Sequence, residues 1–411
     1  MEVKSFKGAA PWVFALALCT GLISVFAFGA SPVSAQDNYQ WSIETVDSAG
    51  NVGEYTSMAL DASGNPHISY LDWTNSDLKY ARWTGSSWNI QTVDNTEGLG
   101  PYHTSITLDS SSYPHISYYA DYPIEELRYA KWTGNSWSVE TVDNTRVACL
   151  DTSIALDSFG NPHISYLENG NLKYAKWTGS AWSIETVDSN LGASVGCTSI
   201  ALDSSGNPHI SYCDYTNVDL KYARWTGSSW SIETVDSTGA VGGCTSMALD
   251  SSGYPHISYC DGTNFDLKYA KWAGSSWSIQ TVDSAGDVGL YTSIALDSSD
   301  YPHISYYDAT NDDLKYARWT GSSWSIQTVD STGDVGWLET SIALDSSGNP
   351  HISYYDDDKG DLKYAHLIQA ADNIPTENEN VNPEFPTLVI VAALVGCGAA
   401  VGLALFLKRR V

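Results

Sequence analysis

The sequence is poor in basic residues. Its 411 residues hold 20 Lys and Arg against 48 Asp and Glu, which gives a formal net charge of −28. Five of the basic residues lie in the two terminal segments, so the part between them is more acidic still. Nucleic acids and anionic membrane surfaces are bound through basic patches. The composition therefore excludes nucleic acid as a partner and is typical of a soluble, self-repelling protein.

Several chemical motifs are also missing. The chain has no phosphate-binding loop, and no two of its seven cysteines are separated by two residues, so neither nucleotide nor zinc-ribbon chemistry is indicated. It has no Asn-x-Ser/Thr glycosylation acceptor, which a glycosylated coat protein would often carry. We find no nucleophile paired with a base, and we expect no enzymatic activity.

The first long apolar run lies at the N-terminus. Lys4 and Lys7 precede an apolar stretch from Trp12 to Ala30, and small residues follow up to Ala35. This order predicts a secretory signal peptide over residues 1–35, with an uncleaved anchor helix as the alternative.

The second apolar run lies near the C-terminus. It predicts a transmembrane helix over residues 387–407, with a buried core helix as the alternative, and a cytoplasmic basic tail over 408–411. The polar, acidic segment 369–386 is typical of a flexible stalk. We therefore expect a cell-surface, extracellular domain tethered to the membrane by its C-terminal helix.

A short motif precedes that helix. Pro383-Glu384-Phe385-Pro386-Thr387, then the apolar run, then the basic cluster resemble the PEF-type C-terminal sorting signal of archaeal surface proteins. The resemblance covers about the last thirty residues. It implies an archaeal source and removal of the tail by an archaeosortase-like enzyme.

The central part of the chain is a tandem repeat. Four phrases recur in order about every 47 residues, as in Thr292–Asp297 (TSIALD), Pro302–Tyr306 (PHISY), Leu314–Trp319 (LKYARW) and Trp324–Asp330 (WSIQTVD). Each alternates in side-chain character and is rich in β-branched and aromatic residues, and short polar turns separate them. Four short antiparallel strands in seven copies predict an all-β, seven-bladed β-propeller of four-stranded blades over residues 36–368.

The offset of the repeat supports a closed ring over an open solenoid. The chain enters with the fourth phrase alone, Trp41–Val46, and its last copy ends with the third phrase, Leu362–Leu367. We expect the N-terminal strand to complete the last blade, whereas a solenoid would need polar caps at both ends.

The blades resemble known propeller repeats. ALDSSGN followed by a β-rich run resembles the NHL and related extracellular repeats, and more loosely the sialidase Asp-box. At Asp297 and Asp345 the Ser two residues earlier and the final Trp of the Asp-box are missing. The resemblance therefore implies the architecture and no particular activity.

Comparison of the seven copies separates scaffold from candidate binding surface. The PHISY histidines recur in every copy, so we interpret them as structural. The variable segments all join the second strand to the third, or one blade to the next, and in a propeller these loops open on one face. We expect this variable face to bind the ligand. Its candidate contact residues are Tyr55, Trp73, Tyr102, His103, Tyr122, Tyr215, Phe265, Tyr291 and Trp337.

A candidate calcium site lies in the last repeat. Asp356, Asp358 and Asp361 have oxygens at near-alternate places, which is a loose match to a calcium loop.

Four cysteines fall on the first two strands of neighbouring repeats. Cys197 with Cys213, and Cys244 with Cys260, share a spacing of sixteen and predict two within-blade disulfides, with Cys213–Cys244 as an alternative and Cys149 left over.

We therefore expect a surface-anchored binding module that recognises a neutral glycan or a protein. Of the fifteen basic residues between the terminal segments, only Arg146 and Lys359 lie in variable loops, which argues against anionic substrates and sialidase-type chemistry. A surface-layer or adhesion component is the alternative, and a glycoside-acting enzyme is a third possibility.

Overall fold

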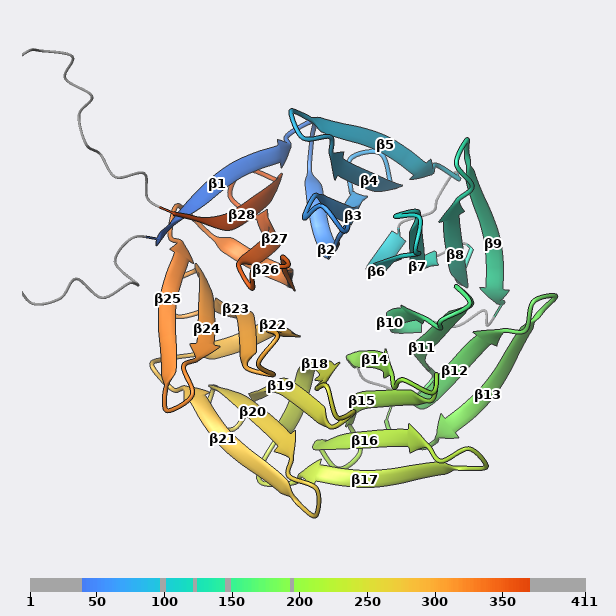
Figure 1. The fold of residues 1–411 in the computed structure, drawn as a ribbon, viewed down its shortest axis with the longest axis vertical. Coiled ribbons are helices and arrows are strands. Elements are labelled where there is room, and N and C mark those ends of the chain that lie inside the picture. The colour runs from blue at the N-terminus through green and yellow to red at the C-terminus, as the bar shows by residue number, and fades with distance from the viewer. Residues whose placement is uncertain (1–38, 97–100, 121–123, 145–148, 193–195, 370–411) are drawn as a thin grey trace, which may run out of the picture. The chain divides into compact units, whose positions relative to one another are not determined.

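The computed structural model describes residues 39–96, 101–120, 124–144, 149–192 and 196–369, and these residues form strands, turns and loops with no helix among them. Twenty-eight strands form seven four-stranded antiparallel sheets arranged in a ring (Figure 1). The predicted seven-bladed propeller is confirmed. The predicted membrane span 387–407, the signal peptide, the stalk and the basic tail all lie outside the described residues, and within these no helix is long and apolar enough to cross a membrane.

Each blade uses the four sequence phrases in order, from the axis outward. The first four blades are β2 (Val52–Leu60), β3 (Pro66–Asp72), β4 (Asp77–Trp83) and β5 (Trp88–Asp94); β6 (Pro101–Leu108), β7 (Pro114–Ala120), β8 (Glu126–Trp132) and β9 (Trp137–Asp143); β10 (Cys149–Leu156), β11 (Pro162–Glu168), β12 (Asn171–Trp177) and β13 (Trp182–Asp188); and β14 (Thr198–Leu202), β15 (Pro208–Asp214), β16 (Asp219–Trp225) and β17 (Trp230–Asp236).

The remaining three blades follow the same order. They are β18 (Val241–Leu249), β19 (Pro255–Asp261), β20 (Asp266–Trp272) and β21 (Trp277–Asp283); β22 (Val288–Leu296), β23 (Pro302–Asp308), β24 (Asp313–Trp319) and β25 (Trp324–Asp330); and β26 (Val335–Leu344), β27 (Pro350–Asp356), β28 (Asp361–Gln369) and β1 (Tyr39–Asp47).

The ring closes through the N-terminal strand. β1 pairs antiparallel with β28, from Tyr39 opposite Gln369 to Asp47 opposite Leu362, so the first strand of the chain is the outer strand of blade 7. This confirms the closure expected from the repeat offset.

The core lies between the blades. Each of seven apolar clusters takes members from two neighbouring blades, and the strand-two phrase is almost entirely buried in every copy. The tyrosine hydroxyl of this phrase donates to the carboxylate of the aspartate that ends the outer strand of the preceding blade, at 2.5–2.8 Å. The pairs are Tyr70–Asp47, Tyr118–Asp94, Tyr166–Asp143, Tyr212–Asp188, Tyr259–Asp236, Tyr306–Asp283 and Tyr354–Asp330.

A second ring of hydrogen bonds joins the inner strands. The threonine of each TS pair bonds to the strand-two serine of the preceding blade at 2.7–3.0 Å, as Thr198 does with Ser165. The serine of each TS pair accepts a backbone N–H from the following blade at 3.0–3.2 Å, as Ser153 does from Ile200. The inner strands surround a channel along the axis of the ring. Buried polar groups must find partners, so the Thr-Ser pair recurs because its two hydroxyls bond to the neighbouring blades around this channel.

Candidate functional site

The inner strands surround a cavity of 290 Å³ at the end of the channel that faces the variable loops. In six of the seven blades the residue just before the Thr-Ser pair lines this cavity, and in the remaining blade that residue packs on His103; five residue types occur at this position. We call these seven residues the axial rim: Tyr55, His103, Asp151, Cys197, Cys244, Tyr291 and Glu339.

The backbone of the rim is bulged. The strand register shifts in this region of most inner strands. Five rim residues have a left-handed backbone: Tyr55, His103, Cys244, Tyr291 and Glu339. Such conformations are uncommon for residues other than glycine, and bulges re-aim side chains at functional sites. The bulge turns these side chains out of the regular alternation and toward the channel mouth.

Three charged rim residues lie together. His103 Nδ1 is 2.9 Å from Glu339 Oε1 and 3.7 Å from Asp151 Oδ1. Burial raises the pKa of Asp151 to about 7, although His103 and two backbone N–H groups favour its charged form. Burial alone would lower the pKa of His103, but the hydrogen bond to Glu339 and the two carboxylates raise it. The charge on each of these three side chains therefore depends on the charges of the other two.

The rim cysteines correct the predicted disulfides. Cys197, Cys213, Cys244 and Cys260 are all free thiols, so the expected bridges Cys197–Cys213 and Cys244–Cys260, and the alternative Cys213–Cys244, are not formed. The bulge at Cys244 turns its thiol toward the axis, where it forms hydrogen bonds with the thiols of Cys197 and Cys260. Cys213 instead faces the Val241 carbonyl of the next blade.

The two rim thiols and the neighbouring thiol of Cys260 differ in acidity. Hydrogen bonds from Cys197 and Cys260 lower the pKa of Cys244 well below its usual value, because they stabilise its thiolate. The same contacts raise the pKa of Cys197 and of Cys260. Cys149 has no described side chain.

The structure brings together several of the predicted contact residues. His103, Tyr215 and Tyr291 line the axial cavity. Tyr55 contacts both His103 and Tyr102, at centroid distances of 4.6 and 5.4 Å, and the Tyr102 ring lies 5.8 Å from exposed Trp73.

The other predicted contact residues lie apart from that chain of rings. Trp337 packs on Tyr291 at 5.3 Å, and Phe265 is exposed by itself in its loop. Tyr122 is outside the described residues.

The predicted calcium loop does not converge. Asp356 is fully buried and is paired with the ammonium groups of Lys359 at 2.7 Å and Lys363 at 3.7 Å. Asp358 instead accepts the backbone N–H of Asp334. Among the described residues, only His103, Asp151 and Glu339 form a set of three or more metal-ligating side chains whose ligand atoms all lie within 4.8 Å of one another.

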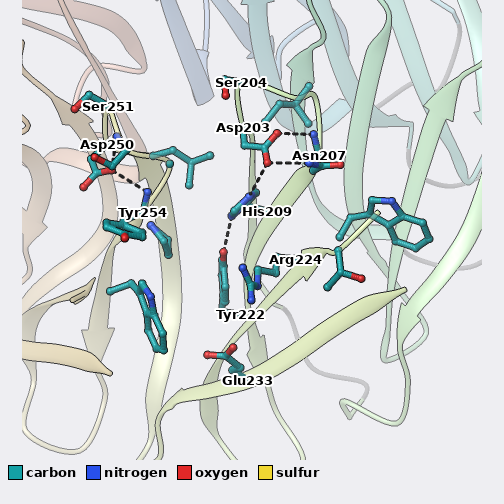
Figure 2. Close-up of a pocket in the computed structure, with 18 residues that line it drawn as sticks. Asp203, Ser204, Asn207, His209, Tyr222, Arg224, Glu233, Asp250, Ser251 and Tyr254 are labelled. Carbon is teal, nitrogen blue, oxygen red and sulfur yellow. Dashed lines mark hydrogen bonds and ion pairs between the residues drawn. The ribbon is translucent and has the colours of Figure 1, made fainter. Parts of the chain in front are cut away.

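A larger cavity of 630 Å³ lies on the opposite face, between blades 4 and 5 (Figure 2). We call it the inter-blade groove. The turn carrying Asp203 and Asn207 forms one wall, and the turn carrying Asp250 and Tyr254 forms the other. The face expected to be uniform therefore carries the larger of the two cavities.

Two charged groups of the groove have no protein partner. Across the described chain, no hydrogen bond or ion pair engages the guanidinium of Arg224 or the carboxylate of Glu233, and both line the groove. At the equivalent junction one blade earlier, Glu185 accepts the indole N–H of Trp230. The indole N–H of Trp277 is left unbonded at this junction.

Blade 4 alone has this pair of residues. At the two equivalent positions, counted from the repeat, the other blades carry Arg82 and Gln91, Lys131 and Glu140, Lys176 and Glu185, Lys271 and Gln280, Arg318 and Gln327, and His366 and Glu44. Trp225 and Trp272 complete the groove with aromatic surface.

Sequence reasoning missed both sets of residues for different reasons. The rim residues Asp151 and Glu339 precede a recurring phrase, and an alignment of the seven copies column by column would have shown them. Arg224 and Glu233 lie in strand phrases that recur, so their type suggested scaffold. Lys131 and Glu140 also have no hydrogen-bond or ion-pair partner among the described residues, and the Trp182 indole beside them is unbonded too. What sets Arg224 and Glu233 apart is therefore their place in the lining of the 630 Å³ cavity.

No protein-family model matches the chain, and no curated protein matches it. Solved structures do match. An ulvan lyase, described as a polysaccharide lyase bound to -[GlcA(1-4)Rha3S]-, aligns over 80% of this chain and 96% of its own with a TM-score of 0.57 and 14% identity.

Two sugar-bound lectins also match. The Aleuria aurantia lectin with α-methyl-L-fucoside covers 72% of this chain and 99% of its own, at a TM-score of 0.50 and 15% identity. The SapL1 lectin with α-methyl fucoside aligns over 68% of this chain and 97% of its own, with a TM-score of 0.50 and 14% identity. At such identities the likeness shows the fold alone, and the chain shares the β-propeller architecture of these proteins.

Proposed function

We propose that this protein is a glycan-binding propeller that takes a neutral sugar in the inter-blade groove. The observation that carries the proposal is the unpartnered pair Arg224 and Glu233, which faces aromatic surface in a cavity of 630 Å³. Binding cavities of this size combine apolar walls with a few convergent polar groups.

The chemistry of the groove suits a sugar ring. Trp225 and Trp272 offer flat apolar surface for C–H groups, and Arg224 donates while Glu233 accepts from hydroxyls. Asp203 and Asp250 also line the groove, so a single guanidinium faces several carboxylates and an anionic sugar is disfavoured. The two fucoside-bound lectins support the proposal, because they are propellers of similar architecture that bind neutral sugars.

A glycan array probed with residues 36–369 tests the proposal. We expect Glu233→Gln and Arg224→Gln to weaken binding of the best glycan by about 10- to 100-fold, the loss of one hydrogen bond to a charged group. Glu185→Gln is the matched control, because its amide oxygen can still accept from Trp230. Isothermal titration of each variant gives the dissociation constants.

Two outcomes would contradict the groove as the site. One is equal affinity of Glu233→Gln and Glu185→Gln. The other is loss of binding only when Trp73 or Trp337 becomes Ala, since those residues lie on the variable face that the sequence predicted as the binding surface.

A lyase reaction is the second candidate. The Tyr222 hydroxyl and His209 line the groove 2.5 Å apart, and such a pair can accept a proton. Both are buried, and the same pair recurs in every blade, which favours a structural role. Appearance of unsaturated sugar ends on incubation with polysaccharides would favour the lyase over the binding module.

The terminal segments complete the proposal. We propose that the propeller is displayed at the cell surface by the apolar segment 387–407, and that the PEF-like motif directs its processing. Immunodetection on intact cells, with and without residues 383–411, tests this arrangement.

A further inference from the structure

The axial rim contains an imidazole between two carboxylates contributed by three blades. Asp151 lies in blade 3, His103 in blade 2 and Glu339 in blade 7, and their ligand atoms all lie within 4.8 Å of one another. We propose that the axial rim binds one divalent transition-metal ion of the zinc class through His103 Nδ1, Asp151 Oδ1 and Glu339 Oε1. This site lies at the opposite end of the blades from the inter-blade groove and does not depend on glycan binding there.

The distances fit tetrahedral coordination. Zinc bonds to nitrogen and oxygen are about 2.0–2.1 Å long, so two ligands of a tetrahedral ion lie about 3.3 Å apart. The His103 to Glu339 distance of 2.9 Å and the His103 to Asp151 distance of 3.7 Å lie on either side of that value. The ligand atoms of Asp151 and Glu339 lie within 4.8 Å of each other, so side-chain rotations that bring these two carboxylates closer would place all three atoms around one ion.

The charge of the pocket also calls for a cation. None of the residues that line the axial cavity is Lys or Arg, so His103 is the only basic group beside the two carboxylates. Most other buried carboxylates of the described propeller have a lysine or arginine within 4 Å, as Asp308 has Lys315 at 3.5 Å and Asp72 has Lys79 at 3.4 Å. Buried carboxylates are usually paired or coordinate a metal, and at the rim one imidazole is shared by two carboxylates with no lysine or arginine among the lining residues.

The ligands are held by their surroundings. The two oxygens of Asp151 accept the backbone N–H groups of Thr152 and Thr198, each at 2.7 Å. The ring of Tyr55 packs 4.6 Å from that of His103 and limits its rotation. Groups of this kind orient metal ligands and tune their affinity.

The ligand types select the metal. An imidazole nitrogen with two carboxylates favours Zn²⁺ and similar ions over Ca²⁺ or Mg²⁺, which prefer all-oxygen sites. Three protein ligands leave a fourth position, and it faces the cavity lined by Cys197, Cys244 and Tyr291. Sites with an open position bind water or a further ligand, so the ion would give the variable face a point of attachment for a small donor group.

Metal titration of the full chain tests the proposal. After chelation, we expect isothermal titration with Zn²⁺ to give one ion per chain. Bound Co²⁺ should show the visible absorption of a four-coordinate site. His103→Gln and Glu339→Gln should each weaken Zn²⁺ binding at least about 100-fold, because even loss of an orienting neighbour costs about 10- to 100-fold. Tyr291→Phe is the matched rim control and should bind as the parent does.

Substitution of the two rim cysteines provides a second test, of whether thiolates ligate the metal. The double variant Cys197→Ser and Cys244→Ser should keep its Zn²⁺ affinity, and the Co²⁺ protein should lack a thiolate charge-transfer band. Loss of affinity in that variant, or equal affinity in His103→Gln and Tyr291→Phe, overturns the assignment, as does the absence of stoichiometric binding. Thermal melts of every variant without metal separate loss of the site from loss of the fold.

Discussion

The propeller is expected to lose most of its stability as the pH falls from 6.5 toward 4, and the loss begins well above the pH at which ordinary surface carboxylates titrate. The cause is the histidine of the PHISY phrase. Six of these histidines have a pKa lowered to about 4, and His209 has its pKa lowered as well. Burial is the main cause in all of them.

The contacts of these histidines favour the neutral ring. In six blades the hydroxyl of the third-strand tyrosine is hydrogen-bonded to Nδ1 at 2.5–2.7 Å, and Tyr364 and His351 form the same pair in the seventh. Nε2 lies 3.5–3.8 Å from the aspartate that begins the hairpin turn, too far for a good hydrogen bond. A proton on Nδ1 would require the tyrosine hydroxyl to accept, and the second N–H of the charged ring would have no well-placed acceptor at Nε2.

The sign of the pH effect follows from linkage. The unfolded chain has histidines with a pKa near 6.5, so between pH 6.5 and 4 it binds more protons than the folded chain. The stability is therefore complete above pH 6.5 and is lost as the pH falls toward 4. A shift from 6.5 to about 4 corresponds to about 3 kcal/mol per histidine. Several such groups together exceed the 5–15 kcal/mol that typically separates folded from unfolded chains.

Chemical denaturation of His163→Asn across this pH range measures the effect. The amide can still accept from Tyr174 but does not titrate, so the slope of the unfolding free energy should fall by one proton, about 1.4 kcal/mol per pH unit. Tyr174→Phe is the matched control, since it removes the hydroxyl and keeps the titrating ring. An unchanged slope in His163→Asn would refute the assignment.

Asp151 in the axial rim has the opposite effect on the pH dependence of the unfolding free energy. Asp151 has a folded pKa of about 7, so its contribution is complete below pH 4 and is lost as the pH rises toward 7. One group of this kind cannot offset several histidines, and the net result remains acid lability.

Deletion of β1 is expected to remove cooperative folding. The strand supplies the outer edge of blade 7, the bond from the Trp41 indole to Gln327, and the Asp47 carboxylate that accepts from Tyr70. Val46 also belongs to the apolar cluster between blades 7 and 1. The loss should exceed the roughly 4–5 kcal/mol that marks the most severe single substitutions.

Calorimetry of residues 36–369 and 48–369 measures this loss. The shorter chain exposes the edge of β28, so a synthetic peptide of residues 39–47 should restore the transition by adding a strand. A peptide of scrambled order is the control. A shorter chain that melts with the same temperature and enthalpy as the longer one would show that the ring does not need this closure.

How far the sequence alone leads differs between the fold and the candidate sites. Strand phrases such as Pro302–Tyr306 could be recognised because their alternation and residue types are local properties of the chain. The hydrogen-bonding role of each recurring Thr-Ser pair could not, because its partner lies in another blade. The signal peptide, the membrane span, the sorting signal and Tyr122 stay predictions, since they lie outside the described residues.

The disulfide prediction failed for a physical reason. It assumed that Cys244 and Cys260 face each other across a regular hairpin. The register shift at Gly243 and the left-handed backbone at Cys244 place that thiol beside the thiols of both Cys197 and Cys260, and all three are free. A bulge of this kind cannot be deduced from a spacing of sixteen residues.

The sequence by itself determined the architecture: the number of blades, the order of their strands and the strand that closes the ring all follow from the repeat and its offset. The tertiary structure decided where chemistry can occur. Ring closure brings His103, Asp151 and Glu339 together although 188 residues separate Asp151 from Glu339 in the sequence. The packing of blade 4 on blade 5 leaves Arg224 and Glu233 without partners. Both outcomes depend on neighbours across blades, and such neighbours exist only once the chain has folded.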